Sequence, residues 1–199
     1  MSRIPRSAAH ARRCTLRTRK TDPWRAPVSA SPRPTMSGLV LRSNRLPPMR
    51  IEIDDLTRPE VLARLNEHLA NMYALSPPES VHALDVSGLK GPEISFWTAW
   101  ADGVLLGCGG LKELTPVHGE VKSMRTPAAR RRQGAGRALL DHIVGIAKER
   151  KYQMLSLETG SQAAFAPAQK LYESVGFTCC GPFGSYSEDP NSVFMSLRL

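Results

Sequence analysis

A run of arginines and small residues, Arg130-Arg-Arg-Gln-Gly-Ala-Gly-Arg137, is well suited to bind an anion. Gly134 and Gly136 let a ligand approach the backbone, and they open a helix whose first amides would face that ligand. The arginines add charge-assisted hydrogen bonds, each contributing roughly 1.5–3 kcal/mol. The segment therefore predicts a pyrophosphate site. The alternative is an ordinary basic helix start whose small residues pack under a strand.

The same segment lacks the features of two common phosphate-binding loops. No Gly-Lys-Ser/Thr follows the glycines, as a P-loop requires. Leu139 stands where a dinucleotide-binding fingerprint has its third glycine. The expected ligand is therefore a pyrophosphate bound in a different kind of site.

A second motif, Ala168-x-x-Leu171-Tyr172-x-x-x-Gly176-Phe177, follows toward the C-terminus. The first segment, Arg131-x-x-Gly134-x-Gly136, resembles the acyl-CoA signature of the GNAT superfamily of N-acetyltransferases. The second resembles the fourth-helix motif of the same superfamily. Both stand in the family's order and spacing, and the resemblance covers residues 49–199.

The resemblance implies a fold and a cofactor site. The fold is an α/β domain with a mixed, mostly antiparallel sheet flanked by helices, in which the fourth and fifth strands splay apart. The pantetheine arm of acetyl-CoA would lie in that gap, and the amide of Met124 would polarise the thioester carbonyl. The cofactor-binding residues implied are Met124, Arg125, Thr126, Arg131, Arg132, Gln133, Gly134, Ala135, Gly136 and Arg137.

Two catalytic residues follow from the same resemblance. Tyr172 corresponds to the family's usual acid for the departing thiolate, the alternative being a packing aromatic on an amphipathic helix. An alkylamine with a pKa near ~10.4 must lose a proton before it attacks, and Glu120 is the candidate base. Glu120 could instead be a strand carboxylate paired with Lys122, with water wires removing the proton.

One residue departs from the family pattern. Many members carry asparagine three residues before the motif's alanine, where it binds the cofactor, but this chain has Phe165 there. The segment 157–160 could take over that contact.

The periodicity of apolar residues predicts the elements that position these side chains. Strands are expected at 49–54, 94–101, 104–114, 119–125, 154–159, 177–180 and 193–199, and helices at about 57–75, 134–150 and 164–175, with a helical turn near 80–84. Gly107, Gly109 and Gly110 indicate a bulge or a close backbone approach in the third strand.

The net charge of +9 is unevenly distributed. Residues 1–48 hold eleven Lys or Arg and one acidic residue, whereas residues 49–199 hold sixteen basic and seventeen acidic residues. We expect residues 1–48 to be a disordered, basic, Pro/Arg-rich extension and residues 49–199 to be the acetyltransferase domain. The extension could be a transit peptide or a nucleic-acid arm, or the translation start could be Met49 or Met36. A near-neutral domain is not expected to bind nucleic acid.

Composition indicates a cytoplasmic protein without metal. The four cysteines and the histidines lack metal-ligand spacing, and no apolar run approaches the roughly 18 residues of a membrane span. His82 is a weak candidate for the acceptor site.

The expected activity is transfer of an acetyl group from acetyl-CoA to an amine of a small molecule or peptide by direct attack. The alternative is a non-catalytic acyl-CoA-binding regulatory module. The acceptor, set by the loops 75–89 and 182–192, is unidentified. Small family members often dimerise, so a homodimer fits the resemblance.

Because the extension is expected to be dispensable, a chain that begins at Met49 should fold with an unchanged melting temperature and retain acetyl transfer. Thermal unfolding and turnover of the full and shortened chains check this. A drop in either quantity would show that residues 1–48 pack on the domain.

Overall fold

The computed structural model describes residues 48–75 and 77–199. The extension predicted at residues 1–48 lies, apart from Pro48, outside them. Within the described part, no helix is both long enough and apolar enough to cross a membrane.

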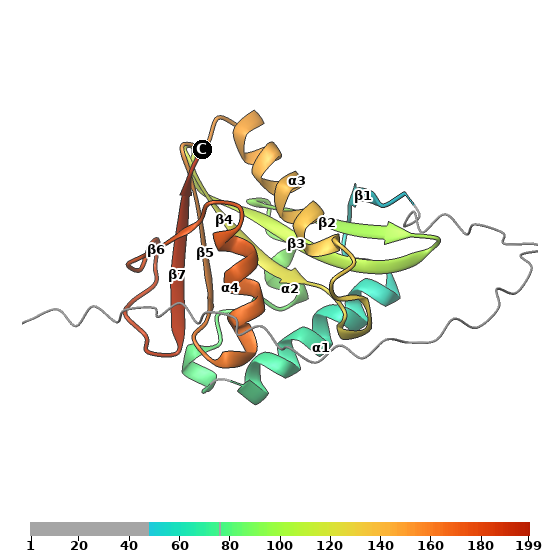
Figure 1. Ribbon diagram of the computed structural model, residues 1–199, viewed down its shortest axis with the longest axis horizontal. Helices are drawn as coiled ribbons and strands as arrows, with labels where there is room; N and C mark the ends of the chain where they lie inside the picture. The colour runs from blue at the N-terminus through green and yellow to red at the C-terminus, as the bar shows by residue number, and fades with distance from the viewer. Residues whose placement is uncertain (1–47, 76) are drawn as a thin grey trace, which may run out of the picture. The chain divides into compact units, whose positions relative to one another are not determined.

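The described residues contain one seven-stranded sheet in the order β1-β2-β3-β4-β5-β7-β6 (Figure 1). Every neighbouring pair in it is antiparallel except β4 and β5, which are parallel. The predicted mixed, mostly antiparallel fold is therefore confirmed. The strands are β1 (Arg50–Ile53), β2 (Ile94–Ala101), β3 (Val104–Thr115), β4 (His118–Arg125), β5 (Met154–Gly160), β6 (Thr178–Cys180) and β7 (Ser192–Arg198).

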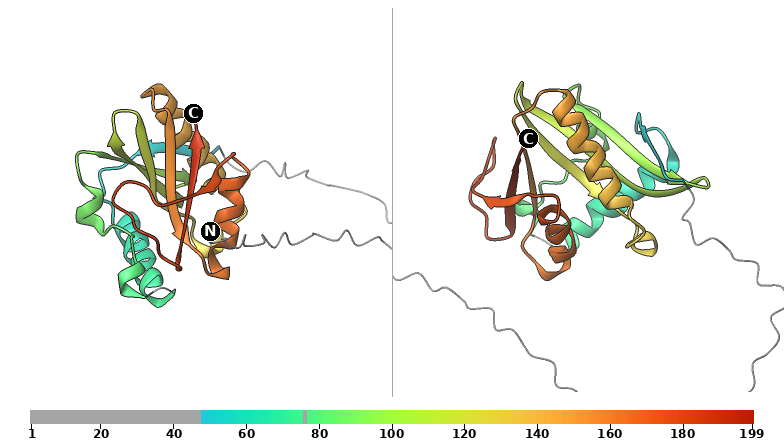
Figure 2. Two further views of the ribbon diagram at one scale, coloured as in Figure 1. Left: turned by 90° about the vertical axis from the view of Figure 1, so that its left-hand side faces the viewer. Right: turned by 45° about the horizontal axis from the view of Figure 1, so that its top comes forward.

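Helices cover both faces of the sheet, and Figure 2 shows α1 and α4 on its two sides. They are α1 (Pro59–Leu75), α2 (Val86–Leu89), α3 (Ala135–Glu149) and α4 (Ala166–Glu173). Alternate side chains of β2 serve the two layers, as strand geometry requires. Phe96 and Trp100 pack with Val61 of α1, whereas Trp97 packs with Leu139 of α3.

Two helical segments begin at other residues than predicted: the turn begins earlier and α4 begins later. The turn expected near 80–84 is a 3₁₀ turn at Pro78–Ser80, and α2 starts only after Asp85, whose carboxylate caps it by accepting from the amide of Gly88 (2.7 Å). Helix α4 starts at Ala166 because Pro167 fits only in the first turn of a helix. Gly176, with φ +105°, follows its end as predicted.

A bulge in β4 explains Gly107 and Gly109 of β3. Cys108 pairs with Arg125 and Gly110 with Lys122, so Ser123 and Met124 together stand opposite Gly109. Ser123 adopts φ +52°, a left-handed conformation uncommon for a residue with a side chain. The predicted close backbone approach in β3 is therefore confirmed.

Replacing Gly107 by alanine should destabilise the protein, because the added Cβ would lie 2.8 Å from the carbonyl oxygen of Arg125. The bulge would have to shift, at a cost of about 1–3 kcal/mol. Gly145→Ala is the matched control: it lies inside α3 with open space around it and should stabilise by about 0.5–1 kcal/mol. Denaturant unfolding of both variants measures the difference. Equal stability would mean that the bulge tolerates the extra atom.

Candidate functional site

The central feature of the site is the separation of two parallel strands. Pairing of β4 with β5 runs from His118/Met154 to Val121/Leu157 and then stops, although both strands continue. Beyond that point Lys122–Arg125 and Glu158–Gly160 diverge, and their facing main-chain groups are left without each other as partners. The predicted splay between the fourth and fifth strands is thus confirmed.

The splay opens into a cleft of about 1130 Å³. Its walls are α1, the segment 80–83, β4 with the loop after it, β5, and the facing parts of α3 and α4. In Figure 1 the arrow of β4 ends beside the first turn of α3. The predicted site residues that line the cleft are Met124, Arg125, Thr126, Arg131, Arg132, Gly134, Ala135, Gly136, Arg137 and Tyr172.

The start of α3 forms the end of the cleft where the sequence predicts an anion site. Gly134 precedes the helix with φ +86°, and the amides of its first turn have no partner within the helix. Arg131 and Arg132 are exposed on the approach. Arg137 reaches away to Asp141, with both contacts at 2.8 Å. This end of the cleft therefore combines oriented amides with two exposed arginines that form no ion pair with any of the described residues.

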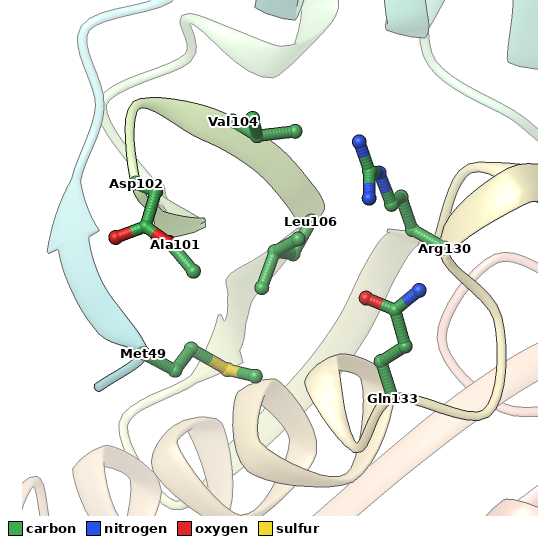
Figure 3. A pocket seen from close by; sticks show the side chains of 7 residues that line it. All are labelled: Met49, Ala101, Asp102, Val104, Leu106, Arg130 and Gln133. Atoms are coloured by element: carbon green, nitrogen blue, oxygen red, sulfur yellow. The ribbon is translucent and has the colours of Figure 1, made fainter. Parts of the chain in front are cut away.

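The side chain of Gln133, by contrast, points into a separate pocket (Figure 3). That pocket, of about 380 Å³, lies between the turn after β2 and the loop before α3. Its other lining residues are Met49, Ala101, Asp102, Val104, Leu106 and Arg130. Of Gln133, therefore, only the main chain remains available to the predicted pyrophosphate site.

Tyr172 lies on α4 at the wall of the cleft and is 7% exposed. Its ring packs edge-to-face against Phe177, with 6.0 Å between centroids. Burial, and after it the negative charge of Glu158, raise the pKa of the Tyr172 hydroxyl. The phenol therefore keeps its proton at neutral pH, as a proton donor must.

Glu120 is buried beside the cleft and does not line it. One carboxylate oxygen accepts from the hydroxyl of Tyr186 (2.6 Å) and lies 3.2 Å from the ammonium of Lys122. The pairing with Lys122 that the sequence left open is thus present. Of these two partners, Lys122 lines the cleft.

Glu158 is a site residue that the sequence analysis did not single out. It follows Leu157, the last residue of β5 that pairs with β4, and it lines the cleft. Its carboxylate accepts a hydrogen bond from the hydroxyl of Ser192 (2.7 Å). Burial raises the pKa of its carboxyl group, while Ser192 acts in the opposite direction. Glu158 and Ser156 are two residues apart and therefore lie on the same face of the strand, which the sequence alone could have shown. How deeply Glu158 is buried could not be predicted from the sequence.

Two loops meet at the end of the cleft opposite the anion site. The ring of His82 packs edge-to-face on Tyr186 (5.0 Å between centroids), and its Nε2 lies 3.9 Å from Asp189. The side-chain amide of Asn191 donates to the hydroxyl of Ser80 (3.2 Å). The loops predicted to shape the acceptor site, 75–89 and 182–192, therefore contact each other.

Two other side chains fit a ligand in the cleft. The Nδ1 of His68 and the hydroxyl of Ser123 are buried without a hydrogen-bond partner among the described residues, and both residues line the cleft. Burial, with the nearby charge of Arg125, lowers the pKa of His68 to about 4, so its ring is neutral. Orphaned polar atoms of this kind call for a ligand or water.

Phe165, the departure from the family pattern, also lines the cleft. The side-chain amide of Gln169 donates a hydrogen bond to the carbonyl of Gly160 (2.8 Å).

Among residues 48–75 and 77–199, no three His, Cys, Asp or Glu side chains are grouped so that they could hold a metal ion.

Comparison with known proteins places the chain among acetyltransferases. The model of the acetyltransferase (GNAT) family matches residues 62–177. The uncharacterized N-acetyltransferase YsnE of Bacillus subtilis is 57% identical over 76% of this chain and 100% of its own length. An IAA acetyltransferase of Azospirillum brasilense is 37% identical over 70% of this chain and 89% of its own length.

The fold is also shared with solved structures. A GNAT family acetyltransferase of Elizabethkingia anophelis, crystallised with acetyl-CoA bound, superposes with a TM-score of 0.54 at 16% identity. The match covers 76% of this chain and 98% of that one. At this identity the likeness shows the fold alone.

Gly136→Val should weaken CoA binding at least tenfold while the protein stays folded. Gly136 stands in the first turn of α3 at the cleft wall, so a branched side chain would fill the space beside the amides. Gly145→Val, in the same helix but with open space around it, is the control. Calorimetric titration of CoA into both proteins measures the effect. Equal affinities would remove the pyrophosphate assignment.

Proposed function

Since this chain belongs to the acetyltransferase (GNAT) family as an N-acetyltransferase, we propose that it transfers the acetyl group of acetyl-CoA to an amine of a small molecule or peptide. The observation that carries the proposal is the splay of β4 and β5, which opens toward the free amides of α3. The acetyl-CoA bound by a neighbour of the same fold supports it.

The two ends of the cleft suit the two ends of this co-substrate. The amides of Ala135–Arg137, with Arg131 and Arg132, would hold the pyrophosphate at the start of α3. The edge of β4 that no longer pairs with β5, at Met124 and Arg125, would bind the amide groups of pantetheine as a neighbouring strand would, together with Thr126 just after the strand. The thioester would then lie near the vertex of the splay.

Acetyl transfer requires an electrophilic carbonyl and a good leaving group. The amide of Met124, at the bulge of β4, is the proposed donor to the thioester oxygen, where negative charge grows during attack. The amine nitrogen attacks the carbonyl carbon, the carbon–sulfur bond breaks, and the sulfur takes its electron pair. Tyr172 then donates the proton that converts the thiolate into a thiol.

The acceptor must also lose protons. Glu158 faces the cleft directly, so we assign to it the first proton of the ammonium group. The second proton leaves the nitrogen after attack and restores the hydroxyl of Tyr172. Glu120, held by Tyr186 and Lys122, takes part in proton transfer only through those groups, and it keeps the buried charge of Lys122 neutralised.

Consumption of acetyl-CoA in the presence of a panel of amines, polyamines and peptides tests the proposal. An enzyme transfers acetyl to at least one amine and releases CoA in equal amount. Tight acetyl-CoA binding without transfer to any amine would indicate the regulatory module instead.

Tyr172→Phe should lower kcat by roughly 10²–10⁴-fold and leave KM for acetyl-CoA almost unchanged. The ring and its packing on Phe177 remain, and only the proton donor is lost. Tyr152→Phe is the control, because that hydroxyl binds Glu113 (2.8 Å) and neither residue lines the cleft. Steady-state kinetics with one accepted amine gives both constants. A Tyr172→Phe protein with the parent kcat would leave Tyr172 a packing residue.

A further inference from the structure

The acceptor end of the cleft holds two charged side chains that face each other across the splay. Lys122 and Glu158 each follow the last residue of their strand that takes part in the pairing of β4 with β5, Val121 and Leu157. Both line the cleft and lie on the face of the sheet that also carries Glu120. Each of them could contact an acceptor, so the hydrogen bonds they already make decide which one does.

Lys122 is already paired. Its ammonium donates to the hydroxyl of Tyr186 (2.8 Å) and to the main-chain carbonyl of His82 (3.1 Å), and it forms an ion pair with Glu120 at 3.2 Å. Two of its three N–H donors are therefore used in hydrogen bonds, and its charge is neutralised by Glu120. A carboxylate on the acceptor would have to compete with Glu120 for Lys122.

Glu158 is only partly engaged. Ser192 donates to one of its oxygens, and among the described residues no Lys, Arg or His nitrogen lies within ion-pair distance of it. His82, which also lines the cleft, lies 3.9 Å from Asp189. The group available to an acceptor at this end is therefore an acid without a partner cation.

Apolar side chains form part of the remaining wall. Met72 and Leu75 of α1, Val81, and Phe165 line the cleft and suit a hydrocarbon or aromatic body. The polar side chains at this end are already engaged, because Asn191 donates to Ser80 (3.2 Å) and His82 lies 3.9 Å from Asp189.

We infer that the acceptor is a primary amine with no carboxylate beside its amino group, and that Glu158 receives its ammonium group. This rests on the proposed acetyl transfer and narrows its substrate class. Arylalkylamines, alkylamines, amino-acid amides and the amino termini of peptides qualify. Free α-amino acids do not, because their carboxylate would enter the cleft beside the charge of Glu158, and the charge of Lys122 is already neutralised by Glu120.

The energetic reason is the burial of an unpaired charge. A carboxylate removed from water without a compensating partner is strongly disfavoured, more so next to another acid. The carboxamide of the corresponding amino-acid amide has nearly the same size as the carboxylate but carries no charge. The discrimination therefore follows charge and not volume.

A matched series tests this with the full chain: phenethylamine, phenylalaninamide and phenylalanine, and the corresponding amine, amide and amino acid with the leucine side chain. We expect the amines and amides to be acetylated with kcat/KM at least 100-fold above the amino acids. Amino acids used as well as their amides would overturn the inference. So would rejection of the amides together with the amino acids, because size would then be the cause.

Failure of the inference and failure of the proposed function give different results. Turnover of free amino acids in preference to the amines refutes the inference while the protein is still an acetyltransferase. No transfer to any amine, with acetyl-CoA bound, refutes the proposed function and the inference with it.

Glu158→Gln supplies the second arm. The glutamine keeps the shape and the contact with Ser192 but loses the charge, so kcat/KM for phenethylamine should fall at least tenfold while the CoA dissociation constant is unchanged. Glu149→Gln, an exposed glutamate at the end of α3, is the control and should leave both constants unchanged. Unaltered kcat/KM in a Glu158→Gln protein of parent melting temperature would overturn the role of Glu158.

Discussion

The parallel pairing of β4 and β5 ends after Val121 and Leu157, and the organisation of the site depends on that interruption. Main-chain N–H and C=O groups withheld from water need partners, so two strands that part inside a domain leave a demand for hydrogen bonds. The bulge at Ser123 and Met124 imposes the divergence by placing two residues opposite Gly109. Gly107 and Gly109 of β3 are needed for the same reason, because side chains there would collide with β4 at Arg125 and Met124.

Charge divides the cleft into two functional halves. Arginines gather near the start of α3, where Arg131 and Arg132 have solvent around them. At the opposite half the ionic groups are buried, and Glu120 and Lys122 neutralise each other. A ligand with phosphates at one end and a neutral thioester at the other fits this gradient in only one direction.

Sequence patterns predicted the elements better than the partners of individual side chains. Periodicity located α3 and the parallel crossover because both depend on residues close together in the chain. The glycine motif likewise placed Gly134 and Gly136 correctly, since a helix start is a local structure. Gln133 belongs to the same motif, but its side chain points into another pocket, a direction set by the distant turn after β2. Glu158 was missed for a similar reason, because its environment comes from Ser192 on β7.

The acceptor half is assembled from segments that are far apart in sequence. The contact between Tyr186 and Glu120 spans 66 residues, and that between Asn191 and Ser80 spans 111 residues. The anion-binding turn, by contrast, forms within α3 and the loop before it. Closing a long loop costs conformational entropy, and contacts between distant residues form slowly. The acceptor half should therefore be among the last parts of the domain to become ordered during folding. A partly folded chain could then already bind the nucleotide end of a ligand before it can select an amine.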